Sequence, residues 1–253
     1  MLDLADAHTA VSTLSGKRIL VTGGTTGIGR AIAVLLASEG ARLHVCGRTP
    51  EHLADAVGRI SEVGTGAGLN VDLGEPGAPE RYVKAASEWL GGLDVAVINA
   101  AIPAEGLTDM SDSELRYAIA VDFTAYLTSA HAAAEAMGAA GGDIVLIGSV
   151  SAHVLGPGST VYAGIKAGIA GFAEALRKEL GPKNIRVTLV EPALTQSDMH
   201  YPDIDAEKQK TMVREEKMLR SEDIAVAVHY ALTQPRRAVV QQIVVAPRLS
   251  EGE

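Results

Sequence analysis

The sequence has little of several things that would each indicate a particular class of protein. Cys46 is the one cysteine among 253 residues, so the chain has no internal disulfide and suits a reducing compartment. No apolar run approaches the roughly 20 residues that a membrane-spanning helix needs. Residues 1–16 have neither the cationic start nor the apolar core of a secretory signal. We therefore expect a cytoplasmic protein that does not insert into a membrane.

Positive charge is also scarce. Lysine and arginine together number 22 against 31 aspartates and glutamates, which gives a net charge of −9, and the basic residues form no stripe. A nucleic-acid partner is not expected, because binding to a phosphate backbone requires concentrated positive charge. The seven histidines lack the paired spacing of a metal site, so we predict no metal.

Short apolar runs alternate with longer segments of helical periodicity along the whole chain. The expected strands are Arg18–Thr22, Arg42–Cys46, Ala67–Val71, Asp94–Ile98, Asp143–Ser149, Ile185–Glu191 and Ala238–Ala246. Strands that are apolar on both faces are typical of a parallel sheet covered by helices on each side. The sequence therefore predicts an α/β fold, with a Rossmann-type doubly wound sheet of seven parallel strands in three α/β/α layers.

No linker or break in composition divides the chain, so we expect one domain over residues 15–253, preceded by a loose N-terminal extension over residues 1–14. The segment Thr195–Arg220 lies between the sixth strand and the last helix and is too long for a simple connection. We predict that it forms a helical lid. In such sheets ligands bind outside the carboxyl ends of the strands, which is where functional residues are expected.

A glycine-rich turn follows the first strand and precedes an amphipathic helix. We expect this turn to bind the pyrophosphate of a dinucleotide cofactor through Gly23, Thr25, Thr26, Gly27, Ile28 and Gly29. Glycine permits a tight turn and a close backbone approach, and the helix N-terminus offers free N–H donors and a positive dipole end to the anion. Alone this turn says little, because any βα turn can contain glycine. Its spacing, G-x-x-x-G-x-G, resembles that of the short-chain dehydrogenase/reductase family.

The end of the second strand bears on the choice of nicotinamide cofactor. An acidic residue there would bind the adenosine ribose and repel a 2′-phosphate, whereas an arginine accommodates that phosphate. This chain has Gly47 where the carboxylate is expected, followed by Arg48 and Thr49. We therefore expect NADP(H) to be preferred over NAD(H), although Arg48 alone would also suit a solvated loop. The pair Asp72-Leu73 resembles the family's turn beside the adenine.

Tyr162 and Lys166 stand four residues apart in a segment of helical pattern, so their side chains share one face. A lysine ammonium stabilises a neighbouring phenolate, which lets a tyrosine exchange a proton with an alkoxide. The pair alone is weak evidence for a catalytic site, and Ser149, thirteen residues before Tyr162 at the end of the fifth strand, makes that interpretation stronger. This order and spacing resemble the short-chain dehydrogenase/reductase family. The resemblance implies that Tyr162 is the general acid/base, that Lys166 tunes it and holds the nicotinamide ribose, and that Ser149 orients the carbonyl; Ser151 is the rival for the serine role.

Several positions depart from the family pattern. After the fourth strand the family usually has Asn-Asn-Ala-Gly, where this chain has Ile98 before Asn99, Ala100 and Ala101. The resemblance still implies that these last three residues line the cofactor site. Asp122 stands where the family commonly has a catalytic asparagine. An aspartate keeps an acceptor oxygen, cannot donate when ionised, and brings a charge near Lys166. We expect a modified proton relay with a shifted pH profile; the alternative is an incidental helix residue.

The sixth strand ends in Pro192-Ala193, where the family usually has Pro-Gly. Pro192 fixes the turn, and alanine is a mild change if its φ is negative. The resemblance implies that this turn and the residues after it contact the nicotinamide. Ser197 is placed like the usual threonine of the family, and Thr195 is the alternative.

The sequence thus predicts an NADP(H)-dependent oxidoreductase acting on a small to medium alcohol or carbonyl. The C-terminal part resembles, more loosely, the branch with 3-hydroxy acid dehydrogenases and clavulanate-type aldehyde reductases. Two alternatives remain: a 3-oxoacyl-thioester reductase, which would need a basic patch for its acidic carrier, and a catalytically impaired NADP-binding regulatory protein. The resemblance also implies a homotetramer, or a homodimer, built on the helices around Glu114–Met137 and Ser159–Leu180.

Overall fold

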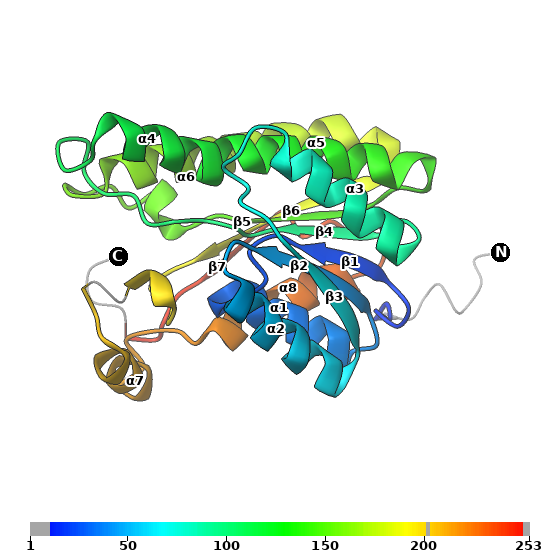
Figure 1. Cartoon of the computed structure of the whole chain (residues 1–253), viewed down its shortest axis with the longest axis horizontal. Coiled ribbons are helices and arrows are strands. Elements are labelled where there is room, and N and C mark those ends of the chain that lie inside the picture. The colour runs from blue at the N-terminus through cyan, green and yellow to red at the C-terminus, as the bar shows by residue number, and fades with distance from the viewer. Residues whose placement is uncertain (1–10, 201–202, 250–253) are drawn as a thin grey trace.

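The computed structural model describes residues 11–200 and 203–249. Seven strands form one parallel sheet in the order β3-β2-β1-β4-β5-β6-β7 (Figure 1). The strands are β1 (Arg18–Val21), β2 (Arg42–Gly47), β3 (Thr65–Asn70), β4 (Val95–Ile98), β5 (Gly142–Ile147), β6 (Ile185–Pro192) and β7 (Gln242–Val245). This order reverses direction between β1 and β4, which is the switch point where such sheets bind ligands. The predicted doubly wound fold is confirmed.

Helices cover both faces of the sheet. They are α1 (Gly27–Ser38), α2 (Pro50–Val63), α3 (Ala78–Leu90), α4 (Asp112–Ile119), α5 (Ala125–Met137), α6 (Thr160–Leu180), α7 (Ala206–Arg214) and α8 (Ser221–Thr233). A π-helical turn, Ala120–Thr124, joins α4 to α5. In Figure 1, α1, α2 and α8 lie on one side of the sheet, and α3, α5 and α6 lie on the other. No helix within residues 11–200 and 203–249 is long and apolar enough to span a membrane.

The two helical layers explain why the strands are apolar throughout. All residues of β6 are buried. Leu189 faces the core beneath α3, α5 and α6, whereas its neighbour Val190 faces the core beneath α1 and α8. A strand that contributes to two cores has no solvent face, so it reads as a continuous apolar run rather than an alternating one.

The last strand is shorter than its predicted span of Ala238–Ala246, because side chains rather than a backbone ladder hold the residues before it. Thr188 on β6 donates its hydroxyl to the carbonyl of Val240 at 2.7 Å. The guanidinium of Arg186 donates to the carbonyl of Ala238 at 3.1 Å. These bonds replace strand pairing until Gln242, where the regular register with β6 begins.

The described residues before β1 and those between β6 and α8 lie outside the regular layers and are held to the domain by backbone contacts. Leu14 is buried, and the amide of Ser12 donates to the carbonyl of Thr233 at 2.8 Å. Ser12 and Leu14, within the segment predicted as a loose extension, thus contact the domain; residues 1–10 of that segment lie outside the described residues. In the segment predicted as a lid, Thr195 and Leu219 form a parallel bridge that brings its two ends together, and α7 lies between them.

Candidate active site

The glycine turn between β1 and α1 has a shape that side chains would prevent. Gly23 has a φ of +63°, and a Cβ there would come within 2.7 Å of the Cα of Ala100 on the neighbouring strand end. Thr26 precedes the first turn of α1 in extended conformation and makes no side-chain capping bond, and that turn holds no acidic residue. The N–H donors of the turn are therefore available to an anion, as a pyrophosphate site requires.

The predicted residues of this turn play different parts. Thr25 is buried and lies where its side chain would meet a Cβ at position 47. Ile28 is partly buried and packs its side chain against the core beneath α1. Gly27 lies beside the predicted nicotinamide contact, because a Cβ there would stand 3.3 Å from the Cβ of Ser197.

Asn99 ties the end of β4 to the start of the glycine turn. Its side-chain nitrogen donates to the carbonyls of Thr22 and Gly23, each at 3.1 Å. In return the hydroxyl of Thr22 accepts from the amides of Asn99 at 2.9 Å and Ala100 at 3.1 Å. These bonds fix the two strand ends on which the turn rests. The sequence predicted that Asn99 braces this strand end but did not indicate Thr22, whose position directly before the first glycine was the available signal.

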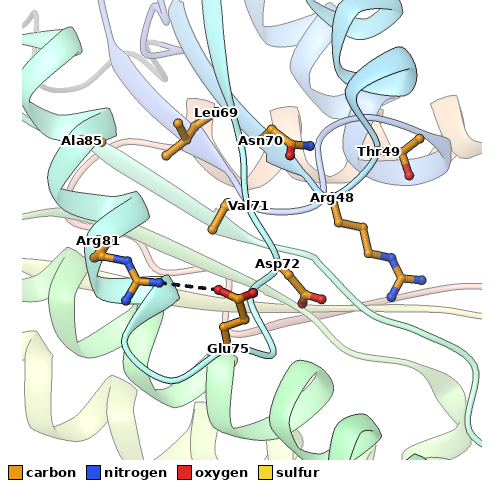
Figure 2. Close-up of a pocket in the computed structure, with 9 residues that line it drawn as sticks. All are labelled: Arg48, Thr49, Leu69, Asn70, Val71, Asp72, Glu75, Arg81 and Ala85. Carbon is orange, nitrogen blue, oxygen red and sulfur yellow. Dashed lines mark ion pairs between the residues drawn. The ribbon is translucent and has the colours of Figure 1, made fainter.

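The end of β2 has no room for an acidic side chain. A Cβ at Gly47 would lie 2.5 Å from side-chain atoms of Thr25. Arg48 follows and is exposed, and Thr49 precedes α2. Beside them a cavity of about 800 Å³ opens at the edge of the sheet (Figure 2). It is lined by Arg48, Thr49, Leu69, Asn70, Val71, Asp72, Glu75, Arg81 and Ala85.

Arg48 and Asp72 are connected by a residue that the sequence analysis did not identify. The hydroxyl of Tyr117, on α4, accepts from Nη1 of Arg48 at 2.8 Å and donates to Oδ2 of Asp72 at 2.7 Å. Oδ1 of Asp72 accepts from the amide of Gly74 at 2.8 Å. The side chain of Leu73 is buried in the core, so this residue offers only backbone to a cofactor. We call the three residues Arg48, Tyr117 and Asp72 the Tyr117 relay.

Lys166 lies at the opposite end of the site, fully enclosed. Its side chain is among the largest that are completely buried, and its Nζ donates to the carbonyl of Ile147 at 3.3 Å. Nζ stands 5.4 Å from the ring centre of Tyr162 and 5.2 Å from that of Tyr126. The sequence predicted the first neighbour and missed the second. Burial alone lowers the pKa of the ammonium, but charge interactions with the two tyrosines and Asp122 outweigh it and raise that pKa above its usual value.

Tyr126 closes this enclosure from α5. Its hydroxyl donates at 2.9 Å to the carbonyl of Ile147, the same oxygen that Lys166 contacts. Burial raises the pKa of Tyr126 to about 12, so its phenol stays protonated at neutral pH.

Asp122 lies in the π-helical turn with no exposed surface. Its Oδ1 accepts from the amide of Ile102 at 2.8 Å, and within the described residues Oδ2 has no hydrogen-bond partner. Burial raises the pKa of Asp122 to about 7, against the opposing pull of the Lys166 cation and the amide of Ile102. From the sequence, this carboxyl is expected to be ionised and unable to donate. Near neutral pH a substantial fraction is protonated instead, and Oδ2 can then donate.

Ser149 lies two residues beyond the end of β5, at the same edge of the sheet, and is nearly buried. Its hydroxyl donates to that of Ser151 and accepts from the Ser151 amide, both at 3.1 Å. The two candidate serines are thus in contact, and Ser151 binds the Ser149 hydroxyl through its amide and its own hydroxyl. His153 in the same loop pairs its Nε2 with Oε1 of Glu191 at 3.1 Å. That buried carboxylate on β6 anchors the loop, so His153 has a structural partner.

The end of β6 distinguishes the two candidates for the nicotinamide contact. The hydroxyl of Thr195 donates to the carbonyl of Ala193 at 2.8 Å and is buried. Ser197 is held through its backbone, because the buried side chain of Gln209 on α7 contacts both its amide and its carbonyl. No bond of the Ser197 hydroxyl is seen within the described part of the chain, which leaves it available to a ligand.

Of the two other positions at this strand end, Pro192 keeps the family residue and Ala193 departs from it without strain. Pro192 is the last residue of β6 and is buried. Ala193 donates its amide to the carbonyl of Val245 at 2.8 Å, and among the described non-glycine residues only Asn184 and Glu216 have positive φ. An alanine therefore fits position 193 without strain. Ala101, three residues beyond the end of β4, is half-buried.

Comparisons with known proteins identify the family of the chain. The sequence model of the short chain dehydrogenase family matches residues 17–208. An uncharacterised oxidoreductase of Staphylococcus aureus (strain USA300) is 32% identical over 240 residues, which make up 94% of this chain and 100% of the relative. A solved short chain dehydrogenase from Burkholderia cenocepacia J2315, in complex with NADP, has a TM-score of 0.82 and 30% identity, covering 93% of this chain and 98% of its own.

A short-chain dehydrogenase/reductase from Serratia marcescens BCRC 10948 has a TM-score of 0.81 at 27% identity, covering 92% of this chain and 97% of its own. The family match and these relatives each cover most of the chain, and the solved structures share its fold. The chain belongs to the short-chain dehydrogenase/reductase family of oxidoreductases.

Proposed function

We propose that this chain is an NADP(H)-dependent oxidoreductase that transfers a hydride between the nicotinamide and a small to medium alcohol or carbonyl compound. The observation that carries the proposal is the enclosure of Lys166 beside Tyr162, with Nζ 5.4 Å from the ring centre. A buried ammonium is costly unless it interacts with groups that develop negative charge. A tyrosine that exchanges a proton during the reaction is such a group.

The residues of the site fit a dinucleotide cofactor. The glycine turn of residues 23–29 and the uncapped N-terminus of α1 would hold the pyrophosphate, and Asn99, Ala100 and Ala101 would border the adenosine ribose. Lys166 would hold the nicotinamide ribose, and Ser197 the nicotinamide amide. When bound, the cofactor supplies or accepts the hydride, and the side chains provide only binding, orientation and proton transfer.

In carbonyl reduction, the hydroxyl of Tyr162 donates its proton to the oxygen that becomes the alcohol, and in alcohol oxidation it takes that proton back. The cation of Lys166 stabilises the phenolate that remains. Ser149 donates to the same substrate oxygen and holds it near Tyr162. The amide of Ser151 supports Ser149 in this role by holding its oxygen, and the Ser149 hydroxyl, which here donates to Ser151, would turn to donate to the substrate.

Asp122 modifies this arrangement. Its carboxyl neighbours the Lys166 charge and carries an unpaired oxygen that has the character of a proton donor or acceptor for a water molecule. In its neutral form the Asp122 carboxyl can both donate and accept a hydrogen bond, as an asparagine side chain can. In its ionised form it competes with the Tyr162 phenolate for the Lys166 cation.

The preference for NADP(H) rests on Gly47 and Arg48. A carboxylate is absent where it would repel the 2′-phosphate, and the space for it is filled by Thr25. Within residues 11–200 and 203–249, the hydrogen bonds and ion pairs of Arg48 reach no carboxylate, so its charge is available to a phosphate. The Burkholderia cenocepacia relative solved with NADP supports the same choice.

Assembly as a homotetramer, or as a homodimer, is part of the proposal. On α6 Gly164 and Gly171 are seven residues apart and face open space, so a Cβ at either would meet nothing within 4 Å. Such a flat exposed face lets a second helix approach closely. Sedimentation velocity would test it, and a monomer at micromolar concentration would contradict it.

The experiment that tests the proposed function is NADPH oxidation by the purified protein across small aldehydes, 3-oxo acids, cyclic ketones and a 3-oxoacyl thioester. We expect turnover of at least one small carbonyl, which is abolished in Tyr162→Phe. Reduction confined to the thioester would identify the acyl-thioester reductase. Tight NADPH binding with no turnover on any compound would identify a regulatory protein and contradict the proposal.

A further inference from the structure

Tyr117 occupies an unusual position for a residue on a surface helix. The oxygen of its hydroxyl joins a cation and an anion, at 2.8 Å from Nη1 of Arg48 and 2.7 Å from Oδ2 of Asp72. The guanidinium carbon lies 6.0 Å from the centre of its ring. Figure 2 shows Arg48 and Asp72 beside the same cavity, reaching it from the ends of β2 and β3.

The relay keeps two opposite charges apart. Both oxygens of Asp72 accept a hydrogen bond, Oδ1 from the amide of Gly74 and Oδ2 from Tyr117. The carboxylate is thus satisfied without the guanidinium. Arg48 in turn uses only Nη1 within the described residues, toward the hydroxyl of Tyr117. Its Nε and Nη2 remain for a ligand, and a guanidinium presents such donors to a phosphate as a fork.

Packing holds the ring of Tyr117 in place. A Cβ at Gly74 would come within 2.6 Å of a ring carbon of Tyr117 and 3.0 Å of a side-chain carbon of Val121. The turn after β3 therefore lies directly on the ring. The helix that carries Tyr117 begins with a complete capping box between Ser111 and Glu114, which fixes its first turn. The hydroxyl is positioned before any ligand arrives.

We propose that Tyr117 is a residue that determines cofactor specificity: it holds Arg48 in place for the 2′-phosphate and prevents Asp72 from pairing with that guanidinium. The inference rests on the proposed preference for NADP(H). Without the hydroxyl, Oδ2 of Asp72 lacks its donor and Arg48 lacks its acceptor, and the two opposite charges then pair with each other. A guanidinium paired with a carboxylate binds a phosphate less well, because the carboxylate competes for its donors and repels the phosphate.

The experiment compares dissociation constants of NADPH and NADH, and of 2′,5′-ADP and 5′-AMP as probes that differ only in the 2′-phosphate. Tyr117→Phe removes one oxygen and keeps the ring. We expect affinity for NADPH and 2′,5′-ADP to fall about 10-fold, the scale of one charge-assisted hydrogen bond. Affinity for NADH and 5′-AMP should change less than about 2-fold, because neither ligand carries the phosphate that Arg48 binds.

Two further variants sharpen the comparison. In Tyr117→Phe/Asp72→Asn the competing charge is gone, so the ratio of NADPH to NADH affinity should return toward the wild-type ratio. Tyr230→Phe is the matched control, because Tyr230 is an exposed tyrosine on α8, away from the cavity. Circular dichroism and thermal unfolding of each variant show whether the fold is retained.

The outcomes separate the two claims. A wild-type protein that binds NADPH no more tightly than NADH overturns the proposed cofactor preference, and this inference with it. A wild-type preference that Tyr117→Phe leaves intact overturns the inference alone. Equal losses for both cofactors in Tyr117→Phe also overturn it, because a merely structural role would weaken both.

Discussion

The two ends of the site hold their charges in opposite ways. At the adenosine end Arg48 is exposed and contacts a neutral hydroxyl. At the reaction end Lys166 is 2% exposed and Asp122 is 0% exposed, and they interact with each other. Both ends lie at the same edge of one sheet, so the difference in how the charges are held comes from burial and not from the strands.

That difference in burial decides what each charge can do. An exposed charge is solvated and screened, so it costs little to keep unpaired and is free to bind a ligand. A buried charge is costly and must interact with its neighbours, which shifts the pKa of every member of the group. We therefore expect cofactor choice and proton transfer to respond to separate substitutions.

Tyr162→Phe tests the reaction end and has the largest expected effect. Removing the hydroxyl removes the proton donor, and turnover should fall about 10³-fold or more, within the range for lost general acid catalysis. The dissociation constant of NADPH should change less than about 2-fold, because the ring remains and Arg48 is untouched. Steady-state rates and a fluorescence titration measure the two. Retention of more than a tenth of the turnover would refute the role of Tyr162.

Arg48→Ala tests the adenosine end. The dissociation constant of NADPH should rise about 10- to 100-fold, since an arginine–phosphate interaction is lost, while that of NADH stays nearly constant. Turnover at saturating NADPH should be preserved. Arg59→Ala is a matched control, because Arg59 is an exposed arginine of α2 that pairs with Asp55. A similar loss for both cofactors would show that Arg48 supports the fold of the loop rather than the phosphate.

Asp122→Asn tests the cost of burial through stability. In the unfolded chain this carboxyl ionises near its ordinary pKa of 3.8, and in the folded protein the pKa is about 7. Below about pH 4 it is protonated in both states, and the variant should match the wild type. Between pH 4 and 7 the unfolded state loses its proton first, so wild-type stability falls. The variant should gain about 4 kcal/mol by pH 7, which is the linkage value for a pKa of 3.8 that rises to about 7, and little more above it.

Unfolding by urea at pH 4, 5.5, 7 and 8.5 measures this difference. A constant offset between the two proteins at every pH would contradict the buried, perturbed carboxyl.

The same substitution has a smaller expected effect on catalysis. As the pH rises through about 7, Asp122 ionises and competes for the Lys166 cation. Wild-type turnover should therefore decline relative to Asp122→Asn by about 2- to 5-fold between pH 6 and 8.5. Superimposable pH–rate curves would indicate that Asp122 does not influence the Tyr162–Lys166 pair.

The sequence predicted those parts of the site that short segments encode. The glycine turn, Ser149 and the pair Tyr162 and Lys166 each stand at a fixed distance from a strand end, so spacing along the chain indicated where they lie. The predicted start of β7 was wrong, because the hydrogen bonds from Thr188 and Arg186 that hold the residues before it leave no periodic signal in the sequence.

Contacts between distant segments were not predictable in the same way. Tyr117 bonds to residues 69 and 45 positions away, and in the sequence it is one more tyrosine on a polar helix. Gln209 and Tyr126 are similar cases, since their roles depend on the turn of α7 and on the position of α5. The protonation state of Asp122 follows from its burial, which only the packed structure provides.

The account's central claim is that an exposed arginine beside a neutral hydroxyl selects NADP(H), separately from the buried groups that transfer the proton. Titration of the wild-type protein with NADPH and NADH under one set of conditions tests it most directly. We predict that NADPH binds at least about 10-fold more tightly and that the advantage shrinks as salt is raised. Equal affinities, or tighter binding of NADH, would contradict the claim.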